Sequence, residues 1–295
     1  MAARVHPTPV ELTMPLTRAY EEHEVGPDIA RIYADIRSSF DLPFVPTIFK
    51  TAAGNPDYLK IMWRDLGPVA ASREFQNAAT AMDEFVRSKA IEGGWRFSDQ
   101  ERVLAEQKIS TFDMPVLAGV VGVFARALPR MLLFVRLMQL GYSGGQKGRF
   151  TSGKQSPALS RLISLHIPGE REAGLRVWLI YAEIRRHTRS KQVMSLYRAL
   201  SPFPGYLASA WLDTKKLFAD REFQRARDQV AHRAAALTVG MPVRDHRALG
   251  RHLEPKQWRD IEDFVDDAAR MLPHYTLLAP VWQRSFASGN QRRAA

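Results

Sequence analysis

Apolar residues recur along the chain with the period of an α-helix. Between residues 29 and 36 they follow the i, i+3, i+4, i+7 spacing that places side chains on one helix face. The same period predicts helices over 58–66 and 74–90, and Ser98 followed by Glu101 fits a capping box for the next helix. The sequence has no sustained alternation of apolar and polar residues and no Asn-Gly or Asp-Gly hairpin turn. The sequence therefore predicts an all-α fold.

This helical pattern occurs twice. Shifting the sequence by 148 residues places IYADIR at 32–37 on IYAEIR at 180–185, and REFQ at 73–76 on the same letters at 221–224. Across the 45 positions from 32 to 76, 16 residues are identical without a gap. The unit is far longer than the ~20 to 50 residues of solenoid repeats. We therefore predict two tandem helical repeats that form a pseudo-dimer.

Residues 141–158 separate the two copies. The stretch is rich in Gly, Ser and basic residues between two apolar segments, which is typical of a linker. The expected domains are a first repeat at 1–140 and a second at 159–295. Residues 148–154 have the spacing of a phosphate-binding loop, but Gln155 follows where a Ser or Thr belongs and no apolar strand precedes them. We expect no phosphate loop there.

The composition is typical of a globular protein that folds without a disulfide or metal. Of the 295 residues, 45% are hydrophobic and 25% are charged, and none is a cysteine. Disulfides, thiol nucleophiles and thiolate metal sites are thereby excluded. The absence of cysteine, together with prolines where a secretion signal needs an apolar run, favours a cytoplasmic protein.

Residues 114–138 form the most apolar stretch and raise the question of a membrane span. Arg126, Arg130 and Arg136 interrupt the stretch at near-helical spacing, and Pro129 lies in its middle. A membrane span needs about 20 apolar residues with few charges. The stretch therefore predicts a buried helix and no membrane span.

The net charge of +11 suggests an anionic partner. The basic residues are mixed with acidic ones along amphipathic segments, and no nucleic-acid recognition motif accompanies them. We therefore expect no nucleic-acid partner, and a basic surface that attracts anionic small molecules.

Two helical repeats, the chain length and the spacing of Pro43, Pro56, Tyr58-Leu59 and Trp63 resemble the DehI-type 2-haloacid dehalogenases. The resemblance implies an active site buried between the repeats, a small carboxylate as substrate, and pairing as a homodimer. It also implies hydrolysis of the carbon–halogen bond of a 2-halocarboxylic acid without a covalent enzyme intermediate.

In that family an aspartate takes a proton from the water that attacks carbon 2. This aspartate follows a serine and precedes the proline of the Pro-x-Tyr-Leu segment by eight residues. Counting back from Pro204 gives Leu196, which cannot accept a proton, preceded by the retained Ser195. Residues 191–204 contain no Asp or Glu. We therefore expect the dehalogenation to be altered or lost.

Other pocket positions also come from the resemblance. The family's pocket aromatics fall on Phe44, which is aromatic, and on Thr47, which is not, while a tyrosine from the last helix falls on Ala268. Thr47 and Ser195 occupy equivalent places in the repeats, so a largely apolar pocket with a hydroxyl from each half could hold a small ligand. The expected substrate-binding residues are Phe44, Thr47, Ser195, Leu196 and Ala210.

Two further constellations have structural and functional interpretations. Glu183 and His187, one helical turn apart, could relay a proton or hold a metal, but surface pairing with nearby arginines explains them as well. Asp65 and Asp213 are equivalent and could share a proton, or could form structural salt bridges. No histidine pair has metal-ligand spacing, and we expect no metal or cofactor.

Three functions remain open at this point. The first is a DehI-like protein with a small-molecule pocket between the repeats, whose dehalogenation is altered or lost. The second is a non-dehalogenating enzyme or a protein that binds an apolar ligand on the same scaffold. The third is a helical interaction module without chemistry.

Overall fold

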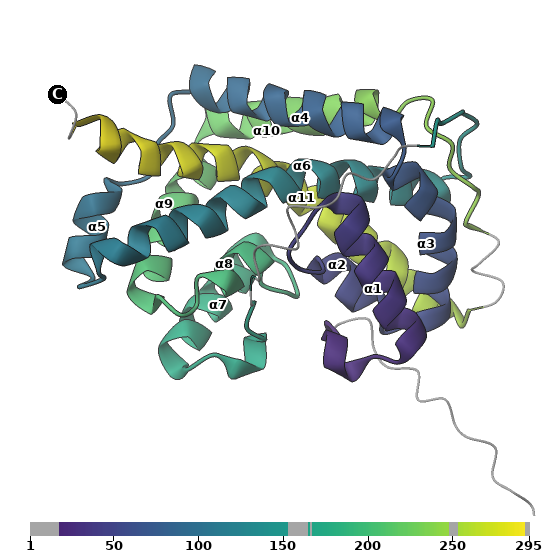
Figure 1. Ribbon diagram of the computed structural model, residues 1–295, viewed down its shortest axis with the longest axis horizontal. Coiled ribbons are helices and arrows are strands. Elements are labelled where there is room, and N and C mark those ends of the chain that lie inside the picture. Colours follow the sequence, from purple (N-terminus) through teal and green to yellow (C-terminus); the bar gives the residue numbers. More distant parts are fainter. Residues whose placement is uncertain (1–17, 153–164, 166, 248–252, 293–295) are drawn as a thin grey trace, which may run out of the picture.

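The computed structural model describes residues 18–152, 165, 167–247 and 253–292 (Figure 1). In these ranges the regular structure is helical, and the only paired β residues are Gln146 and Val243, which form one isolated antiparallel bridge. The predicted all-α fold is therefore confirmed.

The described part of the first half, from residue 18 onward, contains six α-helices. They are α1 (Pro27–Phe40), α2 (Thr47–Ala52), α3 (Pro56–Ala70), α4 (Arg73–Glu92), α5 (Gln100–Glu106) and α6 (Met114–Tyr142). The helices predicted at 58–66 and 74–90 are thus present as α3 and α4, each slightly longer than predicted.

The described part of the second half contains five. They are α7 (Leu175–Thr188), α8 (Ser195–Ala199), α9 (Pro204–Ala219), α10 (Arg221–Leu237) and α11 (Pro255–Arg292). Helices α7 to α10 begin 148 residues after α1 to α4. The equal spacing of the helix starts supports the predicted repeat.

Local signals place these helix starts. Pro56 and Pro204 begin α3 and α9 at the first helical position, where the missing N–H costs nothing. Ser72 and the equivalent Asp220 cap α4 and α10, since their side chains accept the N–H of the third residue of each helix, at 3.2 and 2.8 Å. Different residues thus supply the same cap in both halves.

The predicted capping box at Ser98 is wrong. The residue that caps α5 is Asp99, whose carboxylate accepts the N–H of Arg102 at 3.3 Å. Ser98 instead donates its backbone N–H and its hydroxyl to Asp213, in the other half of the chain. A long-range contact has therefore replaced the local one.

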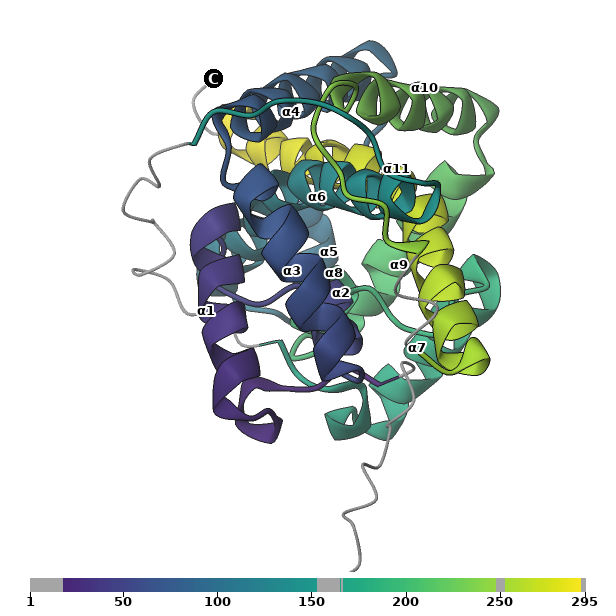
Figure 2. The same ribbon diagram turned by 90° about the vertical axis from the view of Figure 1, so that its right-hand side faces the viewer.

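The two halves share one hydrophobic core. Helices α6 and α11 run through its centre, with α4 and α10 side by side along one edge (Figures 1 and 2). Helices α1 to α3 lie on one side and α7 to α9 on the other. Each side carries an aromatic cluster, one including Phe49, Trp63 and Phe134, the other Tyr197, Trp211, Tyr275 and Trp282.

Helix α6 contains the apolar stretch noted in the sequence. By length and composition it could cross a bilayer, but 72% of its most apolar window is buried inside the fold. Arg126 is exposed and Arg130 and Arg136 are half-buried, so its charges lie toward the outside. The burial is that of a core helix.

The described part of the predicted linker is held against the fold. Gln146 exchanges backbone hydrogen bonds with Val243 at 2.8 and 2.9 Å, and Thr151 donates to Glu74. Gly148 lies so close to the carbonyl of Gly240 that a side chain there would clash with it. Residues 153–158, and with them the end of the phosphate-loop spacing, lie outside the described residues.

Candidate functional site

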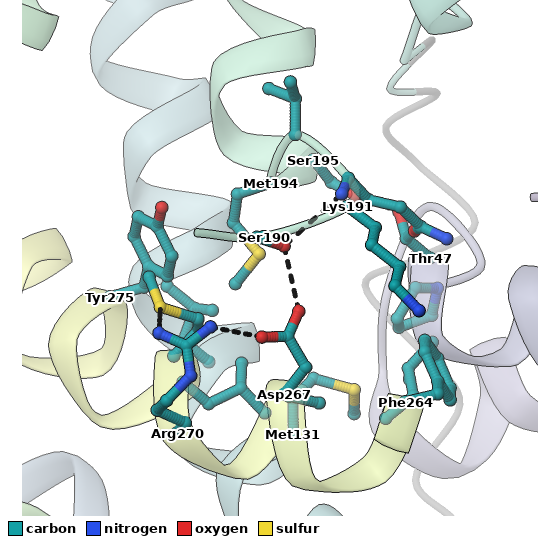
Figure 3. Close-up of a pocket in the computed structure, with 18 of the residues that line it drawn as sticks. Thr47, Met131, Ser190, Lys191, Met194, Ser195, Phe264, Asp267, Arg270 and Tyr275 are labelled. Carbon is teal, nitrogen blue, oxygen red and sulfur yellow. Dashed lines mark hydrogen bonds and ion pairs between the residues drawn. The ribbon is translucent and has the colours of Figure 1, made fainter. Parts of the chain in front are cut away.

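A cavity of about 450 Å³ lies between the two halves of the chain (Figure 3). Its walls come from the start of α2, the middle of α6, the segment from Arg189 to Ser195, and the first half of α11. Most of the residues that line it are apolar, and the larger ones are Phe44, Ile48, Phe124, Leu128, Met131, Met194, Phe264, Met271, Leu272 and Tyr275.

Two hydroxyl groups meet on the cavity wall. Thr47 begins α2 and Ser195 begins α8, and their side-chain oxygens form a hydrogen bond with each other across the two halves. Ser195 is buried, with 5% of its surface exposed, whereas Thr47 is half-buried. The structure therefore brings together two residues that the repeat made equivalent.

Buried cations follow both hydroxyls by one helical turn. Lys50 and Arg198, at equivalent repeat positions, are 7% and 3% exposed. Both bind the carboxylate of Glu21, Arg198 at 3.6 Å, and Arg198 also donates to the Pro168 carbonyl at 2.9 Å. Within the described residues, two cations thus share one carboxylate. Charge acts strongly in a buried environment, so this end of the cavity favours an anion.

Asp267 brings a carboxylate into the cavity from α11 (Figure 3). One of its oxygens accepts a hydrogen bond from Ser190 at 3.0 Å, and the other forms an ion pair with Arg270. Arg270 also donates to the Thr188 carbonyl at 3.1 Å, which ties α11 to the segment after α7. These contacts hold the carboxylate in one orientation.

The rim of the cavity carries charges of both signs. Asp260, Asp263 and Asp266 belong to α11, and Asp266 accepts a hydrogen bond from Gln139 at 3.2 Å. Lys191 is exposed, and no ion pair joins it to another residue of the described ranges. A charged rim around an apolar interior is the arrangement of a small-molecule site.

Tyr275 adds a phenol to the cavity wall. It is 3% exposed, and its ring packs edge-on against Tyr197 and Phe218. Burial first, and the Asp267 carboxylate second, raise the pKa of the Tyr275 hydroxyl far above its ordinary value. The hydroxyl therefore remains protonated and can donate a hydrogen bond. It lies seven residues beyond Ala268, the position that the resemblance suggested for a tyrosine.

The expected substrate-binding residues divide into two groups. Phe44, Thr47 and Ser195 line the cavity. Leu196 and Ala210 are buried, at 0% and 4% exposure, and do not contribute to its lining. Consecutive helical residues point about 100° apart, so Leu196 faces the core when Ser195 faces the cavity.

Glu183 and His187 have separate partners. The Glu183 carboxylate accepts a hydrogen bond from Lys215 at 2.5 Å, while the His187 ring packs edge-on against Trp211 at 5.4 Å. Among the described residues, no group of three or more His, Cys, Asp or Glu side chains could hold a metal ion.

Asp65 and Asp213 also have separate partners, and each of them anchors the other half of the chain. Asp213 accepts the N–H and the hydroxyl of Ser98, after α4, at 2.8 and 3.0 Å. Asp65 accepts from Arg244 and His246, after α10, each at 3.3 Å. These contacts fit the structural interpretation of the two aspartates.

The amino-acid sequence did not reveal Asp267, Tyr275 or the buried cations Lys50 and Arg198 as residues of the site. One signal was available for the cations, since the basic residue Lys50 has the basic residue Arg198 as its equivalent in the second repeat, each within a short apolar segment. No comparable signal marked Asp267, which is one of several acids on a charged helix.

Known proteins resemble the chain in sequence and in fold. An (R)-2-haloacid dehalogenase of Pseudomonas putida is 24% identical over 235 residues, which cover 77% of each chain. An (R)-2-haloacid dehalogenase of Rhizobium sp. (strain NHG3) is 22% identical over 236 residues, which cover 78% of this chain and 90% of the relative.

The solved structures agree with the fold. A D-2-haloacid dehalogenase in complex with L-LA superposes with a TM-score of 0.83 at 21% identity, over 95% of this chain and 99% of the other. A mutant of such an enzyme with D-2-CPA superposes with a TM-score of 0.79 at 20% identity, over 95% and 98%.

The family described as halocarboxylic acid dehydrogenase DehI matches residues 43–197. The match covers more than half of the chain, from the start of the cavity wall at Phe44 to the hydroxyl at Ser195. The expected resemblance is therefore confirmed, and the chain belongs to the DehI family.

Proposed function

We propose that this chain is a hydrolase that binds a 2-halocarboxylic acid in the cavity and replaces its halogen with a hydroxyl group. The observation that supports this function most directly is the cavity, where paired hydroxyls from both halves and the Asp267 carboxylate line one apolar space. The family relatives named above are 2-haloacid dehalogenases, which supports this reaction class.

The substrate carboxylate binds at the hydroxyl pair. Thr47 and Ser195 each have one hydroxyl proton, so both can donate to a carboxylate when they stop bonding to each other. Hydrogen bonds to an ionised acceptor are stronger than those between neutral groups. The positive charge shared by Lys50 and Arg198 one turn away adds to the attraction.

Asp267 is the general base of this proposal. Its carboxylate takes one proton from a water molecule, whose oxygen forms a bond to carbon 2 as the carbon–halogen bond breaks. The halide leaves with the bonding electron pair, and Asp267 later releases the proton to solvent. The products are a 2-hydroxy acid, a halide ion and a proton. Ser190 and Arg270 orient the base.

The test is halide release from D- and L-2-chloropropionate by the purified wild-type chain and by Leu196→Asp. We expect the wild type to release chloride. Because Leu196 is fully buried and outside the cavity lining, Leu196→Asp should lower Tm without raising the rate. No halide from either enantiomer or from longer 2-bromo acids would overturn the reaction, and a faster Leu196→Asp would overturn the assignment of the base.

A second candidate is a binding protein for carboxylic acids that performs no chemistry. The apolar Leu196 at the family's base position favours it. Calorimetry together with the halide assay distinguishes the binding protein from the enzyme, since a binding protein would bind propionate or 2-chloropropionate and release no halide.

The homodimer expected from the resemblance also belongs to the proposal. Leu175, Trp178 and Leu179 follow i, i+3, i+4 spacing on α7, and 76%, 49% and 56% of their surfaces are exposed. An exposed apolar helix face of this kind is typical of a protein interface. Leu179→Glu should give a monomer in sedimentation velocity, whereas Arg31→Glu, at the equivalent position of α1, should not. An unchanged sedimentation coefficient for Leu179→Glu would contradict pairing through α7.

A further inference from the structure

The cavity is much larger than a three-carbon haloacid. A water molecule occupies about 30 Å³ in the liquid, and a 2-halopropionate takes up about four times that volume, or ~120 Å³. The cavity measures about 450 Å³. A short acid bound at Thr47 and Ser195 would therefore leave most of the space to water, against walls that are mostly apolar.

The walls beyond the hydroxyl pair suit a flexible apolar group. Met131, Met194 and Met271 line the cavity from three segments of the chain, together with Phe124 and Phe264. Methionine side chains adapt their shape to irregular apolar partners. Met194 takes the place that the rigid Pro46 has in the first half, so the second-half wall is the more adaptable one.

The polar groups define which end of a ligand goes where. The buried cations and hydroxyls favour an anionic group beside Thr47 and Ser195, and apolar side chains make up most of the remaining lining. A ligand that matches this arrangement of polar and apolar groups carries one carboxylate and a long apolar substituent.

We propose that the substrate class of this site is a 2-halocarboxylic acid of about five to eight carbons in total, with a medium-length alkyl or aryl substituent, rather than a two- or three-carbon haloacid. The inference rests on the proposed function for the halogen, whereas the length and polarity of the ligand follow from the cavity alone. Each CH₂ group that enters the cavity contributes through the burial of apolar surface.

The test separates binding from chemistry. Dissociation constants of propionate, hexanoate and octanoate are measured by calorimetry, and halide release is measured with the 2-bromo acid of each length. We expect affinity to rise about two- to fourfold per CH₂ group up to the octanoate, and kcat/KM to rise with it.

The outcomes distinguish the two proposals. If affinity and kcat/KM are flat or fall beyond three carbons while short 2-bromo acids are hydrolysed, the substrate class is wrong and the dehalogenation stands. If affinity rises with length but no acid releases bromide, the ligand class stands and the dehalogenation fails.

Filling the cavity gives a second readout. Ala268→Leu adds three carbons to the wall on α11, and it should shorten the preferred acid by about three carbons, because the interior is close-packed. Ala269→Leu makes the same change at the next position, which does not line the cavity, and should keep the wild-type length profile. Ala127→Leu is an equivalent filling variant on α6. A wild-type profile for both filling variants would overturn the substrate class.

Discussion

The two halves of the chain build the same scaffold and contribute different chemistry to the cavity. From α6 come only apolar lining residues, Phe124, Ala127, Leu128 and Met131. From α11 come four aspartates and Arg270 among the apolar ones. Several core positions, such as Trp63 and Trp211, carry the same residue in both halves, whereas others, such as Phe40 and Thr188, do not. The repeated helices are thus retained with a subset of shared core residues, while the cavity lining from the two long helices differs in charge.

The largest expected effect comes from removing the Asp267 carboxylate, which α11 contributes to the cavity and α6 does not match. Asp267→Asn keeps the size of the side chain but cannot take a proton from water. We expect kcat for halide release to fall about 10²- to 10⁴-fold, the usual contribution of a general base. Initial rates with a 2-bromo acid measure this effect.

Asp266→Asn is the matched control. It changes the neighbouring aspartate on the same helix, which is exposed and accepts a hydrogen bond from Gln139. We expect it to retain at least half of the wild-type rate, since changes at exposed positions have effects of about twofold or less. Equal rates for the two variants would show that Asp267 is not the base.

The repeated aspartates should differ in their contribution to stability. Asp65→Ala leaves the ring of His246 without its partner, and because the two side chains are 2% and 4% exposed this should cost about 2 to 3 kcal/mol. Asp213→Ala should cost less, about 1 kcal/mol, because the Ser98 N–H and hydroxyl that lose their acceptor belong to a half-buried residue. Urea unfolding at pH 7 gives both free energies.

A conservative variant sharpens this comparison. Asp213→Asn retains one carbonyl acceptor for Ser98 and should recover part of the lost stability. If Asp213→Asn were as destabilising as Asp213→Ala, the loss would come from packing and not from the hydrogen bonds.

The two long helices should also respond differently to pH. Burial, and next the charge of Arg227, lower the pKa of His274 on α11 to about 4. A folded pKa below the unfolded value of about 6.5 means that the fold prefers the neutral ring. The neutral His274 ring therefore makes its full contribution to the free energy of unfolding above pH 6.5, and this contribution is lost as the pH falls toward 4.

This loss should amount to about 1 to 2 kcal/mol, discounted because the ring is only partly buried. Unfolding free energies of the wild type and His274→Gln, compared between pH 7 and pH 4.5, measure it. Arg130, which follows the Leu-Pro pair of α6 as His274 follows that of α11, stays charged over this range. A wild-type pH slope in His274→Gln would contradict the assignment.

The helices could be predicted from the sequence because their signals are local. Apolar period, prolines at the first helical position and the 148-residue repeat all lie in the letters themselves. The meeting of Thr47 and Ser195 could be anticipated for the same reason, since equivalent residues of a doubled unit can approach each other across its axis.

The rest of the site depends on contacts that no local pattern encodes. Asp267 reaches the cavity because Arg270 and Ser190 fix α11 against the segment after α7. Ser98 fits a capping box by its letters, yet its hydroxyl donates to Asp213 in the other half. Leu196 matches a family position by counting, but its place in a helix that begins at Ser195 turns its side chain into the core.

The smallest predicted effect concerns the hydroxyl pair where the halves meet. Thr47→Val leaves the Ser195 hydroxyl without its partner, and Ser195 is only 5% exposed, so unfolding should cost about 1 kcal/mol less free energy. Ser195→Ala leaves the half-buried Thr47, which water can reach, and should cost about half as much. Urea unfolding measures both changes.

The double variant Thr47→Val/Ser195→Ala removes both polar groups. It should therefore be about as stable as the wild type or slightly less so, because replacing both partners leaves no unsatisfied group. Propionate affinity should nevertheless fall stepwise, about threefold for each hydroxyl removed. Additive losses of stability would show that the two hydroxyls act separately, and the two halves would then meet at this wall without being coupled through it.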